Sequence, residues 1–400
     1  MNNETRKETQ VLPKDVRYVG ADDLTLPLFE NQYPVQPMGV SYNSYLILDE
    51  KVAVMDSVDA RAADEWLAKL AHELDGRRPD YLVISHMEPD HSGSILRLAE
   101  RYPEMQLVGN AKTFAMLRQF FGAKAPTDDR LLEVGEGETL PLGAHTLHFM
   151  LAPMVHWPEV MVAYEETEKL LFSADAFGRF GSLGRTANAP WAPQARRYYY
   201  NIVGKYGAQV QALLKKASAL EIKTICPLHG PVLTGEALGE ALRLYDLWSR
   251  WQSESPDDIL LAHASIHGNT VRAAELLKQK LEAKGARVTL CDLTTTEVSY
   301  AVANAFYCGK LVLACSTYDG GLFPPMEEFL SHLQAKGFRS RTVGLMENGS
   351  WAPAAARLMR AKLEEMQDLR VCGTVVSLRS ALSPASEAQM DALTTELCAK

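Results

Sequence analysis

The segment ISHMEPDHSGS, Ile84 to Ser94, places four potential metal ligands within six residues. They are two imidazoles and two carboxylates, His86, Glu88, Asp90 and His91. The apolar run PDYLVIS, which leads into this segment, is typical of a buried strand. A strand end holds side chains rigidly while leaving them open to a cleft. The cluster therefore indicates a metal site much more strongly than a solvated turn.

Three further acid or imidazole side chains also follow apolar, strand-like runs. They are His156 in PMVHWPEV, Asp175 in LFSADAFG and His229 in CPLHGPV. With the first cluster they make a mixed nitrogen and oxygen set, which is large enough for two divalent ions that share one carboxylate. His145 and His148 lie outside any tight turn and are interpreted as ordinary strand residues.

Residues 1–252 combine strands, turns and interspersed helices. SYLILDEKVAVMDSV predicts a hairpin, and RAADEWLAKLAHEL has apolar residues at helical spacing. Further strands are predicted at MQLVGN, HTLHFMLAPMVH, KLLFSAD and KTICPLHG, and a helix at GEALGEALRLYDLWSRWQ. The polar segment SESPDD, residues 253–258, is then the predicted linker between two domains.

Residues 259–400 alternate regularly between strand and helix. The predicted strands are ILLAHAS, RVTLCDL, KLVLACST, RTVGLME and RVCGTVVSL, and the helical stretches between them include NTVRAAELLKQKLEAKG, PPMEEFLSHLQAKG and APAAARLMRAKLEEM. Apolar strands that alternate with helices indicate a parallel sheet covered on both faces. This half of the chain is therefore predicted to be a doubly wound α/β domain.

Three loops of this second half follow predicted strands and have the composition of a ligand site. SIHGNT opens a helix, whose N-terminus offers backbone N–H groups and a favourable dipole to a phosphate. It lacks the GxGxxG pattern, so NAD is disfavoured. STYDGGLFPPM and ENGSWAPAA add the aromatic rings of Tyr318 and Trp351, which suit a flat ligand ring. For Tyr318, an ordinary core position remains the alternative.

Composition limits the partners and the compartment. The formal net charge of −9 argues against nucleic acid or an anionic membrane as the main partner. No apolar run is long enough to span a membrane, and the first residues lack the apolar stretch of a signal peptide. The six cysteines form no CxxC pair, so we expect reduced thiols, a cytoplasmic protein and no rubredoxin-type iron site in this chain.

The spacing His-x-Glu-x-Asp-His resembles the signature of the metallo-β-lactamase fold, which usually reads His-x-His-x-Asp-His. Glu88 stands where the zinc hydrolases carry histidine, and a harder, negatively charged oxygen ligand favours iron over zinc. Together with HWPE, FSADAFG, PLHGP and GLFPPM, this form is similar to the flavodiiron proteins, also called A-type flavoproteins. The resemblance covers nearly the whole chain. It implies a metallo-β-lactamase-like αββα sandwich followed by a flavodoxin-like domain.

The resemblance also implies two sets of cofactor ligands. His86, Glu88 and His156 would bind one iron, Asp90, His91 and His229 the other, and Asp175 would bridge the two. The FMN phosphate would be held by Ser265, His267, Gly268, Asn269 and Thr270, although flavodoxins often have threonine where His267 stands. The flavin ring would lie between Ser316, Thr317, Tyr318, Asp319 and Gly320 on one side and Asn348, Gly349, Ser350 and Trp351 on the other.

Such a protein is expected to reduce O₂ to water, NO to N₂O, or both. The resemblance implies an external electron donor, such as rubredoxin or a reduced deazaflavin, and a head-to-tail homodimer or a tetramer built from it. Two alternatives stay open: a metal-dependent hydrolase of the metallo-β-lactamase fold, and a flavin electron carrier with a structural metal site. The ligand residues do not separate O₂ from NO. Trp157 and Tyr164 are candidates for that choice by their sequence position alone.

Overall fold

The computed structural model describes residues 12–399 and contains two compact units. The first unit comprises Met1–Tyr199 and Ala208–Asp246, and the second comprises Tyr200–Gly207 and Leu247–Lys400. Strand β17 (Ser255–Ala264) includes four residues of the segment predicted as a linker, so these residues belong to a sheet. Pro256 and Asp257, which follow Ser255 in this strand, are both exposed. The start of the strand therefore has the composition of a linker. The domain limits 1–252 and 259–400 remain predictions, and residues 1–11 and 400 lie outside the described part.

Two six-stranded sheets form the centre of the first unit. The first sheet has the order β1 (Val16–Tyr18), β6 (Tyr45–Leu48), β7 (Val52–Met55), β8 (Tyr81–Val83), β9 (Gln106–Gly109), β10 (Leu131–Glu133). The second has the order β11 (Thr139–Pro141), β12 (Thr146–Leu151), β13 (Met161–Glu165), β14 (Leu170–Phe172), β15 (Thr224–Cys226), β16 (Leu233–Thr234). The predicted hairpin is the antiparallel pair β6–β7. One apolar core, which includes Ile47 and Val83 from the first sheet and Phe149 and Phe172 from the second, joins the two sheets face to face.

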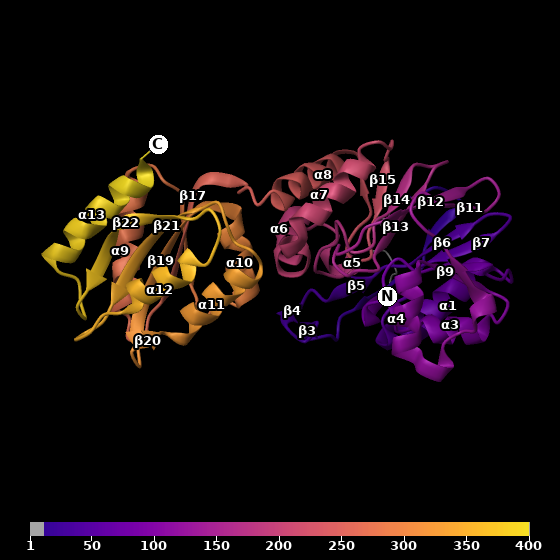
Figure 1. The fold of residues 1–400 in the computed structure, drawn as a ribbon, viewed down its shortest axis with the longest axis horizontal. Helices are drawn as coiled ribbons and strands as arrows, with labels where there is room; N and C mark the ends of the chain where they lie inside the picture. Colours follow the sequence, from indigo (N-terminus) through magenta and orange to yellow (C-terminus); the bar gives the residue numbers. More distant parts are fainter. Residues whose placement is uncertain (1–11, 400) are drawn as a thin grey trace, which may run out of the picture. The chain divides into compact units, whose positions relative to one another are not determined.

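Helices lie beside both sheets of this unit (Figure 1). The helices α1 (Ala63–Leu74), α3 (Ile95–Arg101) and α4 (Ala111–Phe121) accompany the first sheet, and α6 (Trp191–Tyr198), α7 (Gly207–Ala217) and α8 (Gly235–Ser249) accompany the second. Helix α1 buries Trp66, Leu70 and Leu74 along one face, as its periodicity predicts. The arrangement is the predicted αββα sandwich.

A short hairpin, β3 (Leu28–Phe29) and β4 (Tyr33–Pro34), precedes the first sheet's central strands in the sequence. Its turn is closed by a hydrogen bond of 3.0 Å from the Gln32 N–H to the Phe29 carbonyl. The two residues between them, Glu30 and Asn31, have φ angles of +50° and +54°. A second short pair, β2 (Ala21–Asp23) and β5 (Val40–Tyr42), flanks this hairpin in the sequence.

The second unit contains a parallel sheet with the order β18 (Val288–Asp292), β17, β19 (Cys308–Tyr318), β21 (Thr342–Asn348), β22 (Arg370–Leu378). Its helices are α9 (Asn269–Ala283), α10 (Val298–Tyr307), α11 (Pro324–Ala335), α12 (Ala355–Glu364) and α13 (Pro384–Cys398). Residues of α9 and α13 share an apolar core with β17, β19 and β22, so these two helices cover the same face. The strand order and the helices on both faces confirm the flavodoxin-like fold.

The described part of the chain, residues 12–399, contains no helix that is long and apolar enough to cross a membrane. All six cysteines are free thiols, as predicted, and only Cys398 is not fully buried.

Candidate metal centre

The predicted metal ligands lie at strand ends of both sheets in the first unit. His86 follows β8, Asp175 follows β14 and His229 follows β15, while His156 lies in the connection between β12 and β13. The other three ligands surround the short helix α2 (Pro89–Ser92): Glu88 is its N-cap residue, and Asp90 and His91 lie within it. The two sheets thus supply ligands to one place because their strand ends meet there.

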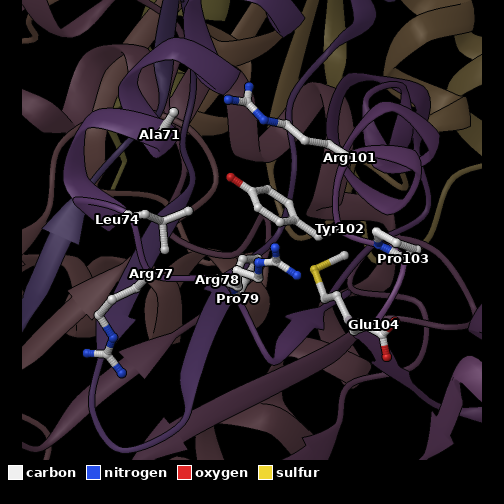
Figure 2. Close-up of a pocket in the computed structure, with 11 residues that line it drawn as sticks. Ala71, Leu74, Arg77, Arg78, Pro79, Arg101, Tyr102, Pro103 and Glu104 are labelled. Carbon is white, nitrogen blue, oxygen red and sulfur yellow. The ribbon is translucent and has the colours of Figure 1, made fainter.

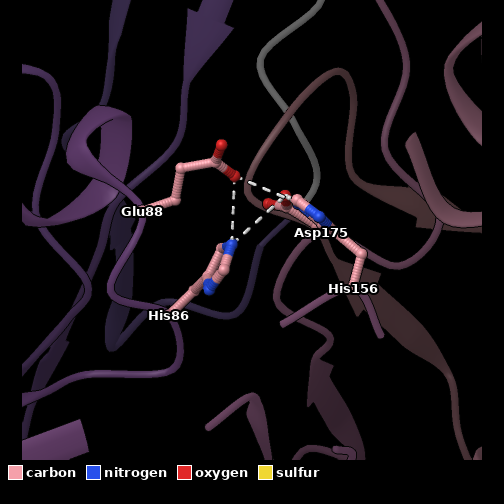
Figure 3. Close-up of side chains that lie close together, drawn as sticks. All are labelled: His86, Glu88, His156 and Asp175. Atoms are coloured by element: carbon pink, nitrogen blue, oxygen red, sulfur yellow. Dashed lines mark hydrogen bonds and ion pairs between the residues drawn. The ribbon is translucent and has the colours of Figure 1, made fainter. Parts of the chain in front are cut away.

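The first group consists of His86, Glu88, His156 and Asp175 (Figure 3). One Glu88 oxygen lies 3.2 Å from His86 Nε2 and 3.0 Å from His156 Nε2. The Asp175 Oδ2 atom lies 3.1 Å from His156 Nε2 and 3.8 Å from His86 Nε2. Two imidazole nitrogens and two carboxylate oxygens therefore converge on one point.

The second group consists of Asp90, His91 and His229. The Asp90 Oδ2 atom lies 3.3 Å from His91 Nε2 and 3.2 Å from His229 Nε2. The second oxygen of Asp175, Oδ1, lies 3.1 Å from His91 Nε2 and 3.7 Å from His229 Nε2. Asp175 thus presents one oxygen to each group. All seven predicted residues come together, and in the predicted pairing.

Buried carboxylate oxygens in this cluster have few partners among the described residues. Asp90 Oδ1 makes no hydrogen bond with any of these residues, and Asp90 Oδ2 and Asp175 Oδ1 have imidazole nitrogens at 3.1–3.3 Å as their close polar neighbours. Grouping buried carboxylates in this way is costly, and cations would stabilise them. The set of four imidazoles and three carboxylates therefore fits a pair of divalent ions.

Hydrogen bonds on the far side of two imidazoles orient them toward the centre. The Nδ1 atom of His86 lies 2.7 Å from a Glu159 oxygen, and Nδ1 of His229 lies 2.7 Å from the Ser41 carbonyl. When a metal ion is bound, these bonds would keep the ring proton on Nδ1, so both rings would offer their Nε2 lone pairs to the metal. The Tyr198 hydroxyl donates to Asp175 Oδ2 at 2.9 Å, which orients the shared carboxylate.

Proton affinities in the cluster reflect its dense negative charge. Burial lowers the pKa of His156 and His229, but hydrogen bonds and charges of neighbouring carboxylates outweigh it and raise both pKa values to about 9. The same balance, with Glu159 as the strongest partner, raises the pKa of His86 well above its usual value. Burial opposes ionisation of Asp175, but the nearby imidazoles hold its pKa well below the usual range. Protonated imidazoles thus balance the charge of the carboxylates here, and metal ions would displace the imidazole protons.

Some residues around the cluster belong to no sequence motif that predicts their place beside the ligands. Asp56 accepts a hydrogen bond from the Ser85 N–H at 2.7 Å, and burial raises its pKa. Glu159 stands in the quoted motif HWPE, three residues after His156, but nothing in that spacing assigned it to His86. Burial and the carboxylate of Glu88 raise the pKa of Glu30 to about 7.

Of the two aromatic residues considered for the choice between O₂ and NO, Trp157 borders the cluster and Tyr164 does not. The Trp157 ring lies edge-on to the His86 ring, with 5.2 Å between their centroids, so Trp157 borders the cluster. The Tyr164 hydroxyl donates to the Glu221 carbonyl at 2.8 Å, and its ring lies 6.5 Å from the ring of His148. Sequence proximity was therefore misleading for Tyr164, because it lies in β13, within the sheet.

The predicted flavin ligands lie at the carboxyl ends of three parallel strands of the second unit: in the last residues of β19 and β21, in the loops that follow β17, β19 and β21, and at the start of α9. Thr270 Oγ1 lies 2.8 Å from Ser316 Oγ, and Asn348 Nδ2 donates to Thr270 Oγ1 at 3.3 Å. These bonds join the start of α9 to the ends of β19 and β21, at the edge where such sheets bind ligands. Gly268, with φ of +89°, is the N-cap residue of α9, and its N–H donates to Ser265 Oγ at 3.1 Å.

The remaining predicted flavin residues lie at the same strand ends, in the loops that follow them or at the start of α9. Two aromatic residues there are exposed: Trp351 is 86% and Tyr318 is 45% accessible. A fourth loop, after β22, had no signal in the sequence. It joins the others through Ser380, whose N–H donates to Asn348 Oδ1 at 3.1 Å and whose hydroxyl bonds to that of Ser350.

A cavity of about 490 Å³ lies in the first unit away from these residues (Figure 2). It is lined by the ends of α1 and α3 and includes Arg77, Arg78, Arg101 and Tyr102. Helix C-termini are the negative ends of the helix dipoles and favour basic residues nearby. Arg101 lies in the last turn of α3, where this effect favours it, and Arg77 donates to the Asp49 carbonyl. None of the predicted site residues lines this cavity.

Comparisons with known proteins agree with this arrangement. Residues 40–230 match the model of the ODP family beta lactamase. The chain is 28% identical over 363 residues to the rubredoxin-oxygen oxidoreductase of Megalodesulfovibrio gigas, covering 87% of each chain. It is 27% identical over 358 residues to the nitric oxide reductase of Moorella thermoacetica, covering 87% of this chain and 88% of the other.

Among solved structures, the flavodiiron protein from Giardia intestinalis superimposes with a TM-score of 0.88 at 25% identity and covers 98% of both chains. The chain also matches diflavin flavoproteins of Nostoc and Synechocystis, but it spans only 56% and 50% of their lengths.

Proposed function

Because the chain belongs to the flavodiiron proteins, we propose that it is an oxidoreductase that reduces O₂ to water, NO to N₂O, or both. The reaction would take place at a non-haem di-iron centre that receives its electrons from FMN. The observation that carries this proposal is Asp175, which presents one carboxylate oxygen to each of two ligand groups. A single zinc or a surface ion site requires no such shared carboxylate.

The protein residues have distinct roles in this proposal. Two bound irons would supply electrons and exchangeable coordination positions to a diatomic gas, with FMN as their two-electron source. Glu159 and the Ser41 carbonyl hold two imidazoles with their lone pairs toward the centre. The carboxylates of Glu88, Asp90 and Asp175 neutralise the charge that two metal ions bring into a buried site.

Both gases are included because the relatives differ in the activity that their names state. One relative is called a rubredoxin-oxygen oxidoreductase and another a nitric oxide reductase. Reduction of O₂ to two waters takes up four electrons and four protons, whereas reduction of two NO to N₂O and water takes up two of each. The same ligand set would serve both reactions, so the preference depends on groups outside it.

The electron donor and the assembly are also proposals. The names rubredoxin-oxygen oxidoreductase and flavorubredoxin among the relatives support a rubredoxin-type donor, and a reduced deazaflavin is the alternative. A head-to-tail homodimer, or a tetramer built from it, would supply the FMN of one chain to the irons of the next. Sedimentation equilibrium of the purified protein tests this assembly. A cytoplasmic location remains a prediction.

Anaerobic photoreduction followed by separate additions of O₂ and NO tests the function. Iron, zinc and FMN are counted on the same sample, and gas uptake is followed together with flavin absorbance. We expect two irons and one FMN per chain and flavin reoxidation that matches four electrons per O₂ or one electron per NO. Zinc with ester turnover would support a hydrolase instead. Reoxidation that stops at peroxide would support a flavin electron carrier.

A further inference from the structure

Asp175, the residue that the two ligand groups share, lies in a buried loop after β14, the Asp175 loop (residues 173–178). The Ala176 N–H donates to the Ser173 carbonyl at 3.2 Å, and the Ser173 hydroxyl donates to the Ala176 carbonyl at 2.7 Å. The Gly178 N–H donates to the Asp175 carbonyl at 3.1 Å. The loop is thus closed by its own hydrogen bonds, and its backbone conformation sets the position of the shared carboxylate.

Two residues of the Asp175 loop have backbone conformations that their residue types disfavour. Ala174, directly before Asp175, has a φ angle of +50°, and Phe177, two residues after it, has a φ angle of +67°. Bulky residues such as phenylalanine rarely adopt this left-handed region, because Cβ comes too close to the backbone. Such a costly conformation persists only where the surrounding structure holds it. The contacts of Phe177 therefore bear on the position of Asp175.

Two helices of the first unit hold the backbone of Phe177. The hydroxyl of Tyr245, in α8, accepts a hydrogen bond from the Phe177 N–H at 2.5 Å. On the other side of the residue, Trp191 Nε1, in α6, donates to the Phe177 carbonyl at 3.2 Å. The rings of Phe177 and Tyr245 are stacked, with 4.1 Å between their centroids and 28° between their planes. Both side chains are buried, so the Tyr245 hydroxyl is the acceptor that a buried N–H requires.

Removal of the Tyr245 hydroxyl would release the strained backbone of the Asp175 loop. The Phe177 N–H would lose this acceptor in a buried place, which is costly, and its φ angle would relax toward a more favourable region. Asp175 lies two residues away, and its two oxygens each lie 3.1 Å from an imidazole nitrogen of a different ligand group. A small rotation or shift of this carboxylate would therefore change the geometry at both groups.

We propose that Tyr245 is a positioning residue for Asp175. Its hydroxyl and its ring hold Phe177 in the left-handed conformation, and this conformation keeps one oxygen of Asp175 directed at each ligand group. This role rests on the proposed di-iron function. It differs from the role of Glu159, which lies against a single imidazole, because a displaced Asp175 affects both ligand groups at once.

Iron binding to the wild type and to Tyr245→Phe, which removes the hydroxyl and keeps the ring, tests the proposal. Chelator competition measures both iron affinities, EPR after partial anaerobic reduction records the coupled pair, and urea unfolding measures stability. Tyr164→Phe is the matched control, because it removes a hydroxyl that bonds to the Glu221 carbonyl at 2.8 Å in the same unit. We expect Tyr245→Phe to lower both iron affinities by about tenfold and to change the EPR signal of the pair. Tyr164→Phe is expected to match the wild type in iron affinity and EPR signal.

Trp191→Phe, which removes the donor to the Phe177 carbonyl, is the second variant and is expected to change iron affinity in the same direction. A lower unfolding midpoint of Tyr245→Phe with unchanged iron affinities and EPR signal would show a purely structural role and overturn the proposal. Weaker binding of only one iron would also contradict it, because Asp175 faces both groups. A wild type without iron refutes the proposed function, whereas an iron-loaded wild type that Tyr245→Phe matches refutes the role of Tyr245 alone.

Discussion

Glu159 illustrates how a residue outside the ligand set acts on the metal site. Its carboxylate lies 2.7 Å from His86 Nδ1 and accepts the Met87 N–H at 2.9 Å, so it fixes both the ring and the backbone beside it. Removing such a partner usually lowers metal affinity by about 10- to 100-fold. We therefore expect Glu159→Gln, which keeps the shape but not the charge, to bind iron at least about tenfold more weakly.

Competition with a chromogenic chelator measures this affinity. Glu166→Gln is the matched control, because Glu166 also pairs with a histidine, His148, at 2.8 Å, but on the surface. Unchanged iron affinity in Glu159→Gln, or an equal loss in Glu166→Gln, would show that the hydrogen bond to His86 does not orient a ligand.

His263 gives a residue-level prediction for pH. It is buried at the end of β17, and burial lowers its pKa, while the charges of Asp292 and Glu275 oppose this effect. Its folded-state pKa is thus below the unfolded value of about 6.5, so the unfolded chain binds more protons there. Stability from this residue is present above that value and falls as the pH is lowered through it.

Urea unfolding of the wild type and His263→Gln at a series of pH values tests this linkage. We expect the unfolding midpoint of the second unit to fall less steeply in His263→Gln as the pH drops below about 6.5. His72→Gln, on the exposed side of α1, serves as the control and is expected to follow the wild type. Parallel pH profiles of His263→Gln and the wild type would contradict the prediction.

The structure brings together residues that the sequence places close along the chain, and their role as metal ligands stays a prediction. His86, Glu88, Asp90 and His91 were found because one turn carries all four. Glu159 and Tyr198 were not found as neighbours of these ligands, since each reaches the cluster only through the packing of a distant segment. An isolated acid or tyrosine carries no pattern that separates it from an ordinary surface or core residue.

At the scale of elements, Gly268 shows how the start of a helix depends on one backbone conformation. Its φ is +89°, and a Cβ atom there would meet no other atom, so replacement by alanine tests the conformation alone. We expect Gly268→Ala to lower the free energy of unfolding of the second unit by about 1 kcal/mol and to weaken FMN binding.

Gly239 is the matched control, because it lies within helix α8, is exposed and has equally open space. We expect Gly239→Ala to raise stability by about 0.5–1 kcal/mol, since alanine is the better helix former. Urea unfolding and FMN fluorescence titration measure both effects. A rise in the free energy of unfolding of both variants would show that helix propensity outweighs the backbone conformation at Gly268.

Elements with a clear period were predicted well, and those without one were not. The β6–β7 hairpin and the alternation of strands and helices after residue 259 follow directly from apolar patterns. The π-helix at Tyr199–Val203 has no such pattern, because its tyrosine-rich sequence is buried on all sides. The start of β17 is predicted as a linker because Pro256 and Asp257 are exposed and have the composition of one.

For the whole molecule, the two compact units predict separate responses to the two cofactors. The metal ligands all lie in the first unit and the predicted flavin loops in the second. A ligand at 100 times its dissociation constant adds about 2.7 kcal/mol to the stability of the unit that binds it. In calorimetry of the cofactor-free protein, we expect iron to raise one unfolding transition by about 5–10 °C and FMN to raise the other.

Addition of zinc or FMN alone provides the controls for this assignment. A single transition, or an equal rise of both transitions with iron, would show that the units do not unfold independently. The sequence predicted two units from its change of pattern, but not that Tyr200–Gly207 belongs to the second. The assignment of this short segment to the second unit depends on long-range contacts, which no local sequence pattern predicts.

The two-metal site is tested most directly by counting iron per chain and recording the EPR spectrum after partial anaerobic reduction. We predict two irons per chain and the signal of a magnetically coupled pair, which Asp175→Ala abolishes because that residue presents an oxygen to each ligand group. One iron per chain, zinc in its place, or only the signals of isolated ions would contradict a di-iron centre in this protein.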